Sequence, residues 1–206
     1  MKILFAENLS IGYNQPLQEN INIVLETGQV TCLLGKNGTG KSTFLKTLFG
    51  QLLPLNGQIL LENKKIQTIS AEQMAKKMAL VLTENVDQVF LTVEEVVGLG
   101  RYPYLSFLGR LSKDDDQIVQ NALEATEIEN LKNSFFHELS DGEKQKVMIA
   151  KALAQETSII LLDEPFAFLD YPSKLKIFAL LRRIAITQNK AILIVLHELE
   201  LAIQMA

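Results

Sequence analysis

The spacing of hydrophobic residues changes twice along the chain and divides it into three stretches. In residues 2–34 the apolar side chains alternate with polar ones or form short runs between turns, a pattern typical of β-strands. From 92 to 154 the apolar residues recur at helical spacing. Short apolar runs return at 158–162 and 191–196, as in buried strands of a parallel sheet. We therefore expect an α/β core into which a helical block is inserted.

Capping signals mark several helix ends. Ser70 is a suitable N-cap, Ser112 with Asp115 forms a capping-box pattern, and Pro172 is favoured in the first turn of a helix. Together, pattern and caps predict strands at 2–8, 21–25, 30–34, 57–61, 78–82, 158–162 and 191–196. The expected helices are 42–48, 71–77, 93–97, 116–127, 141–155 and 172–187.

The composition is that of an ordinary globular domain. With 206 residues, 48% of them hydrophobic, the chain is long enough for one sizeable core. The formal charge of −4 argues against a broad electrostatic surface for nucleic acid or anionic lipid. The single cysteine, Cys32, is expected to be a buried thiol. Because no apolar run reaches the roughly 18 residues of a membrane helix and the N-terminal one is too short for a signal peptide, we expect a cytoplasmic protein.

Residues 35–42, Gly-Lys-Asn-Gly-Thr-Gly-Lys-Ser, match the P-loop pattern G-x-x-x-x-G-K-[ST]. Between a strand and a helix, the N–H groups of such a loop and the positive end of the helix dipole face one point, which favours phosphate. Lys41 would then reach the β- and γ-phosphates of a nucleotide, and the Ser42 hydroxyl would be a Mg²⁺ ligand. The alternative is a glycine-rich turn without a ligand. The expected nucleotide-binding residues here are Gly35, Asn37, Gly38, Thr39, Gly40, Lys41, Ser42 and Thr43.

Two acidic residues follow the apolar run 159–162, where a parallel strand is expected to end. Open α/β sheets place ligands at the carboxyl ends of their strands, so Asp163 and Glu164 form a Walker B pattern. Asp163 is expected to hold Mg²⁺ through water. Glu164 would act as the general base that polarises a water for attack on the γ-phosphate, a role worth about 10²–10⁴-fold in rate. The alternative is that both acids only cap a helix or lie in a loop.

Residues 139–145, Leu-Ser-Asp-Gly-Glu-Lys-Gln, lead into an expected helix and resemble the signature L-S-G-G-[EQ]-x-[QR] of ATP-binding cassette (ABC) ATPases. Asp141 replaces the first central glycine of that signature, whereas Ser140 and Gly142 are retained. The resemblance implies that these three residues complete the nucleotide site of a second subunit. Ser140 is equally a good N-cap with Glu143 as its capping-box partner, and the two interpretations are compatible.

The resemblance also implies a fold. ABC ATPases combine a P-loop NTPase core of α/β class with an N-terminal antiparallel β-subdomain and an inserted helical subdomain. On this chain the core lobe would be about 1–83 and 156–206, and the helical lobe about 84–155. Family members continue well past the position of Ala206, so the resemblance implies a chain truncated at its C-terminus.

Other residues match the family in order along the chain. Tyr13 corresponds to the aromatic that stacks on adenine, His197 to the switch histidine that contacts the γ-phosphate, and Asp170 to the aspartate of a loop that reaches the second subunit. Phe168 departs from that loop's usual sequence. The alternatives are a turn tyrosine at 13 and a structural histidine at 197; His137 is interpreted as structural.

A further metal ligand is expected between the strand 78–82 and the helix that starts near Thr92. The family has a glutamine there, and counting back from Thr92 without a gap brings Thr83 onto it. Thr83 would offer one oxygen to Mg²⁺ or its water, with Glu84 as the alternative ligand. Gln88 lies five residues further on, about 17 Å in extended chain, and is not expected to enter the site.

Residues 91–104 are similar to the segment T-V-x-E-x-V-x-x-G-R-x-P-Y/W of ABC ATPases that serve iron–siderophore, haem and cobalamin importers. In those systems the helical lobe receives a helix of the membrane permease. We expect the loop 101–104, with its aromatic residues exposed, to be part of that docking surface.

The resulting prediction is an ATP-hydrolysing, nucleotide-binding subunit that powers import of a metal chelate. The expected partners are a second copy of the chain, the permease and, indirectly, an extracellular or periplasmic substrate-binding protein, with no nucleic acid. The expected cofactors are ATP and Mg²⁺, and the expected location is the cytoplasmic face of the membrane. The alternatives are a non-hydrolysing nucleotide-binding regulator and a soluble ABC ATPase of DNA repair or translation. The sequence does not identify the chelate.

Overall fold

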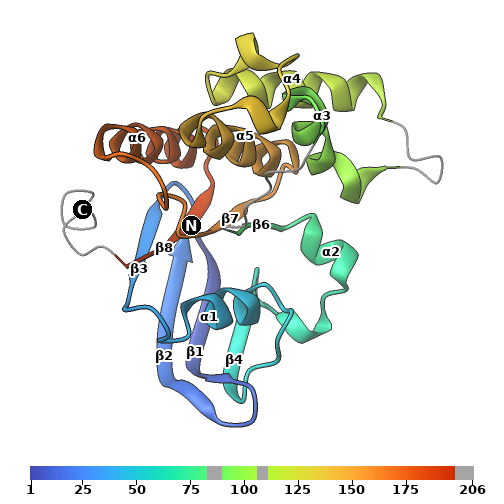
Figure 1. Cartoon of the computed structure of the whole chain (residues 1–206). Coiled ribbons are helices and arrows are strands. Elements are labelled where there is room, and N and C mark those ends of the chain that lie inside the picture. Colours follow the sequence, from blue (N-terminus) through green and yellow to red (C-terminus); the bar gives the residue numbers. More distant parts are fainter. Residues whose placement is uncertain (83–89, 106–110, 198–206) are drawn as a thin grey trace.

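The computed structural model describes residues 1–82, 90–105 and 111–197 (Figure 1). The expected metal ligand Thr83, its alternative Glu84 and the excluded Gln88 all lie outside the described residues. Their assignment therefore stays a prediction.

An antiparallel sheet forms the N-terminal part, with strand order β2-β1-β4-β5. Strands β1 and β2 are longer than expected, because β1 is hydrogen-bonded on both sides and the pairing continues past an irregularity near Asn8. Asn8 is in the left-handed region (φ 47°) at this β-bulge, which shifts the alternation of side chains and ends the sequence pattern early. The four strands are β1 Lys2–Gly12, β2 Pro16–Glu26, β4 Asn56–Leu61 and β5 Lys64–Lys65.

A parallel sheet with strand order β3-β8-β7-β6 forms the centre of the molecule. Its side chains alternate between two hydrophobic cores: Ile159 and Leu161 belong to one, Ile160 and Leu162 to the other. Both faces are therefore covered, which explains the unbroken apolar runs in the sequence. Cys32 on the end strand β3 is half-buried, and this burial raises the pKa of its thiol. The strands are β3 Val30–Leu34, β6 Met78–Val81, β7 Ile159–Asp163 and β8 Ala191–Leu196.

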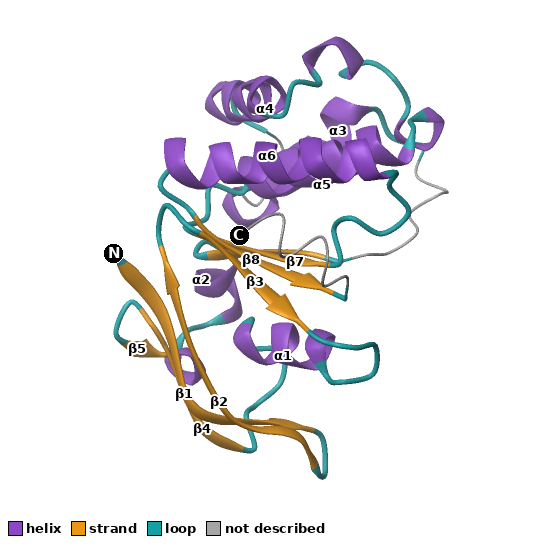
Figure 2. Cartoon of the chain, turned by 90° about the vertical axis from the view of Figure 1, so that its left-hand side faces the viewer, coloured by secondary structure: helices purple, strands orange, loops and turns teal. Residues whose placement is uncertain are grey.

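Helices cover the two faces of the parallel sheet unequally (Figure 2). On one face, helix α1 (Lys41–Leu48) lies between the two sheets, where Phe44, Leu45 and Leu48 are buried in the core that they share with β1. On the other face lie α5 (Asp141–Ala154) and α6 (Tyr171–Thr187). The order is thus antiparallel sheet, α1, parallel sheet, helices.

The helical block lies beyond α5, and four of the described helices, inside and outside this block, begin with capping boxes. These boxes occur at Ser70, Thr92, Ser112 and Ser140, each paired with an acidic or amide residue three positions later. The block shares its core with one face of the parallel sheet, and the division into lobes at residues 84 and 155 stays a prediction. The remaining helices are η1 Ile66–Thr68, α2 Ala71–Ala75, α3 Val93–Gly98, η2 Leu99–Tyr104, α4 Lys113–Ala125, η3 Glu129–Leu131 and η4 Phe136–Glu138.

Candidate active site

The P-loop connects the end of β3 to the start of α1. Gly38 (φ 80°) and Gly40 (φ 91°) are in the left-handed region, which glycine adopts without strain, and Gly40 is the N-cap of α1. A side chain at Gly35 would meet the Thr39 hydroxyl oxygen at 2.9 Å. That hydroxyl instead donates to the Lys36 carbonyl (2.8 Å) and closes the loop. The glycines are therefore where the loop must turn or approach itself closely.

Lys41 is held inside this loop. Its side-chain ammonium donates to the carbonyl oxygens of Gly35 (2.9 Å) and Lys36 (3.0 Å) and to the Asn37 side-chain oxygen (3.3 Å). The side chain is only 8% exposed, and its Nζ lies 3.6 Å from Oε1 of Glu164. The loop thus concentrates positive charge at the N-terminus of α1, where the helix dipole already favours an anion.

A cavity of about 520 Å³ opens above the loop and joins it to the end of β7. It brings the expected phosphate-binding residues together with Asp163 and Glu164, which are more than 110 positions away in the chain. Leu17 was not predicted from the sequence, where its only signal is its position just after the β1–β2 turn. The cavity is lined by Leu17, Asn37, Gly38, Gly40, Lys41, Ser42, Thr43, Asp163 and Glu164.

The parallel pairing of β7 with β8 positions the two acids. Asp163 is in register with Val195, and the backbone N–H of Glu164 donates to the Val195 carbonyl (3.1 Å). Glu164 is in the left-handed region (φ 45°), a conformation that costs a non-glycine residue roughly 1–2 kcal/mol. Such strained positions often occur at functional sites, because the surrounding structure has to hold them.

Two other candidate catalytic side chains, Lys41 and His197, lie against Glu164. Its Oε2 lies 3.3 Å from Nδ1 of His197, and its Oε1 faces Lys41. The parallel sheet alone makes this possible, since P-loop, Glu164 and His197 follow the strands β3, β7 and β8 at the same edge. The structure therefore brings together residues that the sequence could only assign one by one.

The cavity also contains oxygen atoms that fit a magnesium ion. Ser42 and Asp163 both line it, their side chains carry a hydroxyl and a carboxylate, and Mg²⁺ prefers such oxygen ligands beside a nucleotide's phosphates. The two residues fit the ion; the third expected ligand, Thr83, is outside the described residues.

The signature residues lie at the N-terminus of α5. The Ser140 hydroxyl donates to Oε2 of Glu143 (2.6 Å) and the Ser140 N–H donates to the same oxygen (2.9 Å). These bonds lower the pKa of Glu143, the hydroxyl contact contributing most. Ser140 and Asp141 are exposed, and Gly142 is half-exposed. None of the three lines the cavity of their own chain, so the assignment of Ser140, Asp141 and Gly142 to a second subunit's site stays a prediction.

Tyr13 and Asp170 are likewise outside the lining of the cavity. Tyr13 is 62% exposed at the tip of the β1–β2 hairpin, the same hairpin that brings Leu17 to the P-loop. Asp170 is exposed at the N-cap of α6, beside the exposed Phe168. Adenine stacking by Tyr13 and a trans contact by Asp170 therefore remain predictions.

The expectation that the aromatic residues of 101–104 are exposed is wrong for Tyr104, and the neighbouring Arg101 is buried as well. Arg101 is 4% exposed, and Tyr104 is half-buried with its hydroxyl donating to the Gln155 carbonyl (3.1 Å). Only Tyr102, 74% exposed, has the aromatic surface that was expected of the loop. The reason is close packing: the backbone of Gly100 lies directly on α5 and turns Arg101 inward.

Comparisons with known proteins agree with this geometry. The sequence profile of the family described as ABC transporter matches residues 18–167. An uncharacterized ABC transporter ATP-binding protein of Methanocaldococcus jannaschii is 44% identical over 205 residues, which is 99% of this chain and 71% of that protein. The iron(3+)-hydroxamate import ATP-binding protein FhuC of Bacillus subtilis is 40% identical over 97% of this chain and 74% of that protein. The petrobactin import ATP-binding protein FpuD of Bacillus anthracis is 38% identical over 100% of this chain and 76% of that protein.

Solved structures extend the similarity to the fold. The structure of cbiO1 from Clostridium perfringens, part of the ABC transporter complex cbiONQ, superimposes with a TM-score of 0.87 at 31% identity, over 100% of this chain and 82% of that one. A structure described as an inward-facing metal-chelate type ABC transporter gives a TM-score of 0.87 at 28% identity, over 100% of this chain and 77% of that one. The predicted combination of antiparallel subdomain, P-loop core and helical block is thereby confirmed.

Proposed function

The chain belongs to the ABC transporter family of ATP-binding proteins, and from this premise we propose that it hydrolyses ATP to power import of an iron chelate through a membrane permease. Relatives named for import of iron(3+)-hydroxamate and petrobactin support the class of substrate. Haem and cobalamin are the alternatives within the metal chelates. The observation that carries the hydrolysis is the meeting of Lys41, Glu164 and His197 beside one cavity.

Lys41 binds the phosphates in this proposal. Its ammonium now donates to carbonyl oxygens of its own loop, and the β- and γ-phosphate oxygens of ATP would replace them as acceptors. The N–H groups at the start of α1 would contribute further donors. ATP binding would thus exchange the carbonyl acceptors of Lys41 for phosphate oxygens, while the ammonium stays where it is.

Glu164 is the proposed general base. A water bound at its carboxylate would give up a proton to it while the water oxygen attacks the γ-phosphorus and the bond to ADP breaks. His197, at 3.3 Å, would orient that carboxylate and contact the γ-phosphate. Ser42 and Asp163 would hold Mg²⁺, which when bound neutralises charge on the phosphates.

We propose that a second copy of the chain completes each site. Ser140, Asp141, Gly142 and Asp170 are exposed or half-exposed, which supports contact with the nucleotide of the partner rather than with their own. Asp141 adds a negative charge at the first position of α5, where the family has glycine. An acid at that point is stabilised by the helix dipole but repels a phosphate, so weaker dimerisation on ATP is expected here than with glycine.

The permease is proposed to dock on the helical block near Phe90 and Tyr102, which are 76% and 74% exposed. Within residues 1–82, 90–105 and 111–197, no helix has both the length and the hydrophobicity to cross a membrane. The relatives named as import ATP-binding proteins support the rest of the proposal, in which the chain lies at the cytoplasmic face of the membrane beside its permease, with an extracellular or periplasmic substrate-binding protein as an indirect partner.

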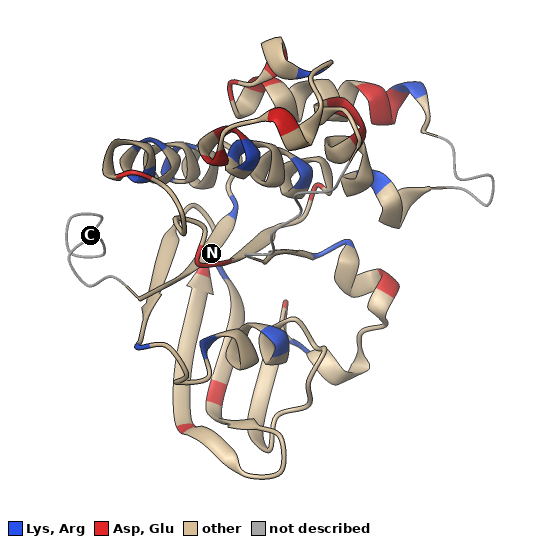
Figure 3. Ribbon diagram, in the orientation of Figure 1, with Lys and Arg blue, Asp and Glu red and all other residues tan. Residues whose placement is uncertain are grey.

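The rival functions make different demands on the same site. A non-hydrolysing regulator is favoured by the departures at Asp141 and Phe168, but it would not need Glu164 and His197 in contact. An ABC ATPase of DNA repair is disfavoured by the charge of −4. Figure 3 shows acidic and basic residues mixed along the helices, whereas a nucleic-acid surface needs clustered basic residues.

The proposal is tested with the purified chain and its permease in lipid vesicles. Phosphate release that depends on ATP and Mg²⁺, and ATP-driven uptake of a ferric hydroxamate, are the expected results. A regulator would instead bind ATP without releasing phosphate. If phosphate is released but none of ferric hydroxamate, haem or cobalamin is taken up, the proposed role in import is wrong. The proposed ATP hydrolysis would still stand.

A further inference from the structure

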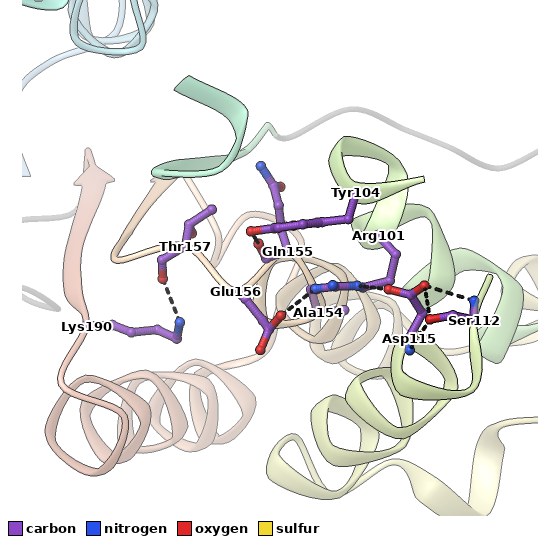
Figure 4. A network of polar contacts seen from close by, with 9 residues as sticks. All are labelled: Arg101, Tyr104, Ser112, Asp115, Ala154, Gln155, Glu156, Thr157 and Lys190. Atoms are coloured by element: carbon purple, nitrogen blue, oxygen red, sulfur yellow. Dashed lines mark hydrogen bonds and ion pairs between the residues drawn. The ribbon is translucent and has the colours of Figure 1, made fainter. Parts of the chain in front are cut away.

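A buried polar network surrounds Arg101 in the helical block (Figure 4). The guanidinium Nε donates to Oδ1 of Asp115 (2.8 Å), and Nη1 donates both to the Ala154 carbonyl (2.7 Å) and to Oε2 of Glu156 (2.8 Å). Arg101 therefore joins three parts of the chain: η2, the start of α4 and the end of α5. An arginine suits this position because its planar fork can serve several acceptors at once.

The backbone beside Arg101 is packed so closely that only glycine fits before it. A Cβ at Gly100 would lie 2.2 Å from the Lys151 carbonyl oxygen of α5. Tyr104 covers the other side, its ring centroid 4.1 Å from the guanidinium carbon. The segment η2 is thus held on α5 by backbone contact, by stacking and by charged hydrogen bonds.

The residues between α5 and β7, 155–158, receive bonds from other elements as well. We call them the α5–β7 connection. The Gln155 carbonyl accepts from Tyr104, and its side-chain amide donates to the Ala75 (2.6 Å) and Met78 (3.3 Å) carbonyls. Lys190, just before β8, donates to the Thr157 carbonyl (2.6 Å). Figure 4 shows two of these contacts, from Tyr104 to Gln155 and from Lys190 to Thr157.

Both elements that meet at this connection have candidate site residues at their far ends. Helix α5 begins beside Ser140, and strand β7 ends in Asp163 and continues to Glu164. On the other side, η2 carries the exposed Tyr102. A displacement of η2 can therefore reach Ser140 through α5, and Asp163 and Glu164 through β7.

We propose that Arg101 is a positioning residue: it fixes η2 to the α5–β7 connection, so that a partner pressing on η2 moves α5 and its N-terminal segment 140–142 as one body. The coupling to a partner rests on the proposed function, whereas the fixing of η2 does not. Without Arg101 the push would be absorbed by η2 sliding on α5.

The test has to remove the contacts of Arg101 without leaving buried carboxylates that have lost their cation. Arg101→Met alone would leave Asp115 and Glu156 without the cation that both contact, and a loss of folding would be uninformative. The triple variant Arg101→Met, Asp115→Asn, Glu156→Gln removes all three charges together. Arg183→Met is the matched control, because Arg183 also pairs with a glutamate and a helix carbonyl, Glu127 (2.6 Å) and Ala125 (2.9 Å), but is exposed.

Two measurements are compared across these variants. In the isolated chain, hydrogen exchange of the backbone amides of 99–104 should be at least ten-fold faster in the triple variant, with residues 147–154 protected as in the unmodified chain. In vesicles with the permease, stimulation of ATP turnover by the permease should fall at least ten-fold, with the basal KM for ATP within two-fold. Arg183→Met should change neither.

The outcomes are distinguishable. Unchanged exchange at 99–104 overturns the fixing of η2, and undiminished stimulation by the permease in the triple variant overturns the coupling. Equal losses of basal and stimulated turnover also overturn it, since they indicate general destabilisation. If the unmodified chain shows no stimulation by a permease, the proposed function fails, while the exchange result still decides the role of Arg101.

Discussion

Lys41 and Arg101 are buried to a similar degree, but one lines a cavity and the other is enclosed between helices. The side chains of Lys41 and Arg101 are 8% and 5% exposed, and each faces carboxylates. Lys41 lines a cavity, bonds mainly to carbonyls of its own loop and has its carboxylate at 3.6 Å. Arg101 fills the space between helices, with two carboxylates at 2.8 Å. Lys41, whose nearest acceptors are neutral carbonyls, can exchange them for the phosphates of a ligand. Arg101, paired with two carboxylates, instead holds structural elements together.

The largest effect is expected at the cavity. Glu164→Gln keeps the shape and hydrogen bonding of the side chain but removes the base, so ATP turnover should fall at least about 100-fold with ATP binding retained. Steady-state phosphate release and equilibrium nucleotide binding measure the two effects, and ATP should then trap a dimer. Near-normal turnover would remove Glu164 from the mechanism. It would also weaken the contrast between Lys41, which serves a reaction, and Arg101, which serves the structure.

The next effect is expected at the Arg101 network and concerns stability. Gly100→Ala should destabilise the fold by about 1–3 kcal/mol, because the new methyl group would meet the Lys151 carbonyl at 2.2 Å. Gly98→Ala is the control, since its Cβ would meet Leu111 Cδ1 at 3.4 Å, an ordinary contact. Urea unfolding compares the two variants. Equal stabilities would mean that η2 is not packed backbone to backbone on α5.

A smaller, pH-dependent effect is expected from Asp115. Hydrogen bonds from the Ser112 hydroxyl and backbone, and then from Arg101, lower the pKa of Asp115 from 3.8 to about 2. A carboxyl whose pKa is lowered by folding stabilises the fold above the unfolded value and loses that contribution as pH falls through the folded value. Between about pH 4 and pH 2 the unmodified chain should therefore lose about 1 kcal/mol more than Asp115→Asn.

The control for this titration is Asp116→Asn, an exposed neighbour in the first turn of the same helix. It shows what the removal of an exposed acid from the same turn does to the pH dependence of unfolding. The measurement is urea unfolding at a series of pH values, and parallel curves for the unmodified chain and Asp115→Asn would contradict the assignment.

The smallest effect on stability is expected at Tyr102. Tyr102→Ala should change the free energy of unfolding by less than about 0.5 kcal/mol because the side chain is 74% exposed. Tyr104→Ala should cost more, since it removes both the stacking on Arg101 and the hydrogen bond to Gln155. Isolated ATP binding should be indifferent to Tyr102→Ala; if transport by the complete importer is also unaffected, docking at Tyr102 is wrong.

The sequence by itself determined the features that depend on neighbours in the chain. The P-loop could be predicted because its glycines, lysine and serine are contiguous, and the helix and strand at its ends follow from local patterning. The capping boxes at Ser112 and Ser140 are likewise local, with partners three residues away. Asp163 and Glu164 were found because they directly follow an apolar strand. The family resemblance then assigned roles to residues that spacing alone left open.

Only the tertiary structure decided which distant residues meet. The contact of Glu164 with Lys41 and His197 depends on the order of strands in the parallel sheet, and the presence of Leu17 at the cavity depends on how the β1–β2 hairpin lies over the P-loop. From the sequence, Arg101 was expected only to belong to a docking loop with exposed aromatic residues, and nothing in the local pattern indicated that it is buried. Its burial follows from the close approach of η2 to α5 and from acceptors 14 to 55 positions away. Such contacts are set by packing of the whole chain, which no local pattern records.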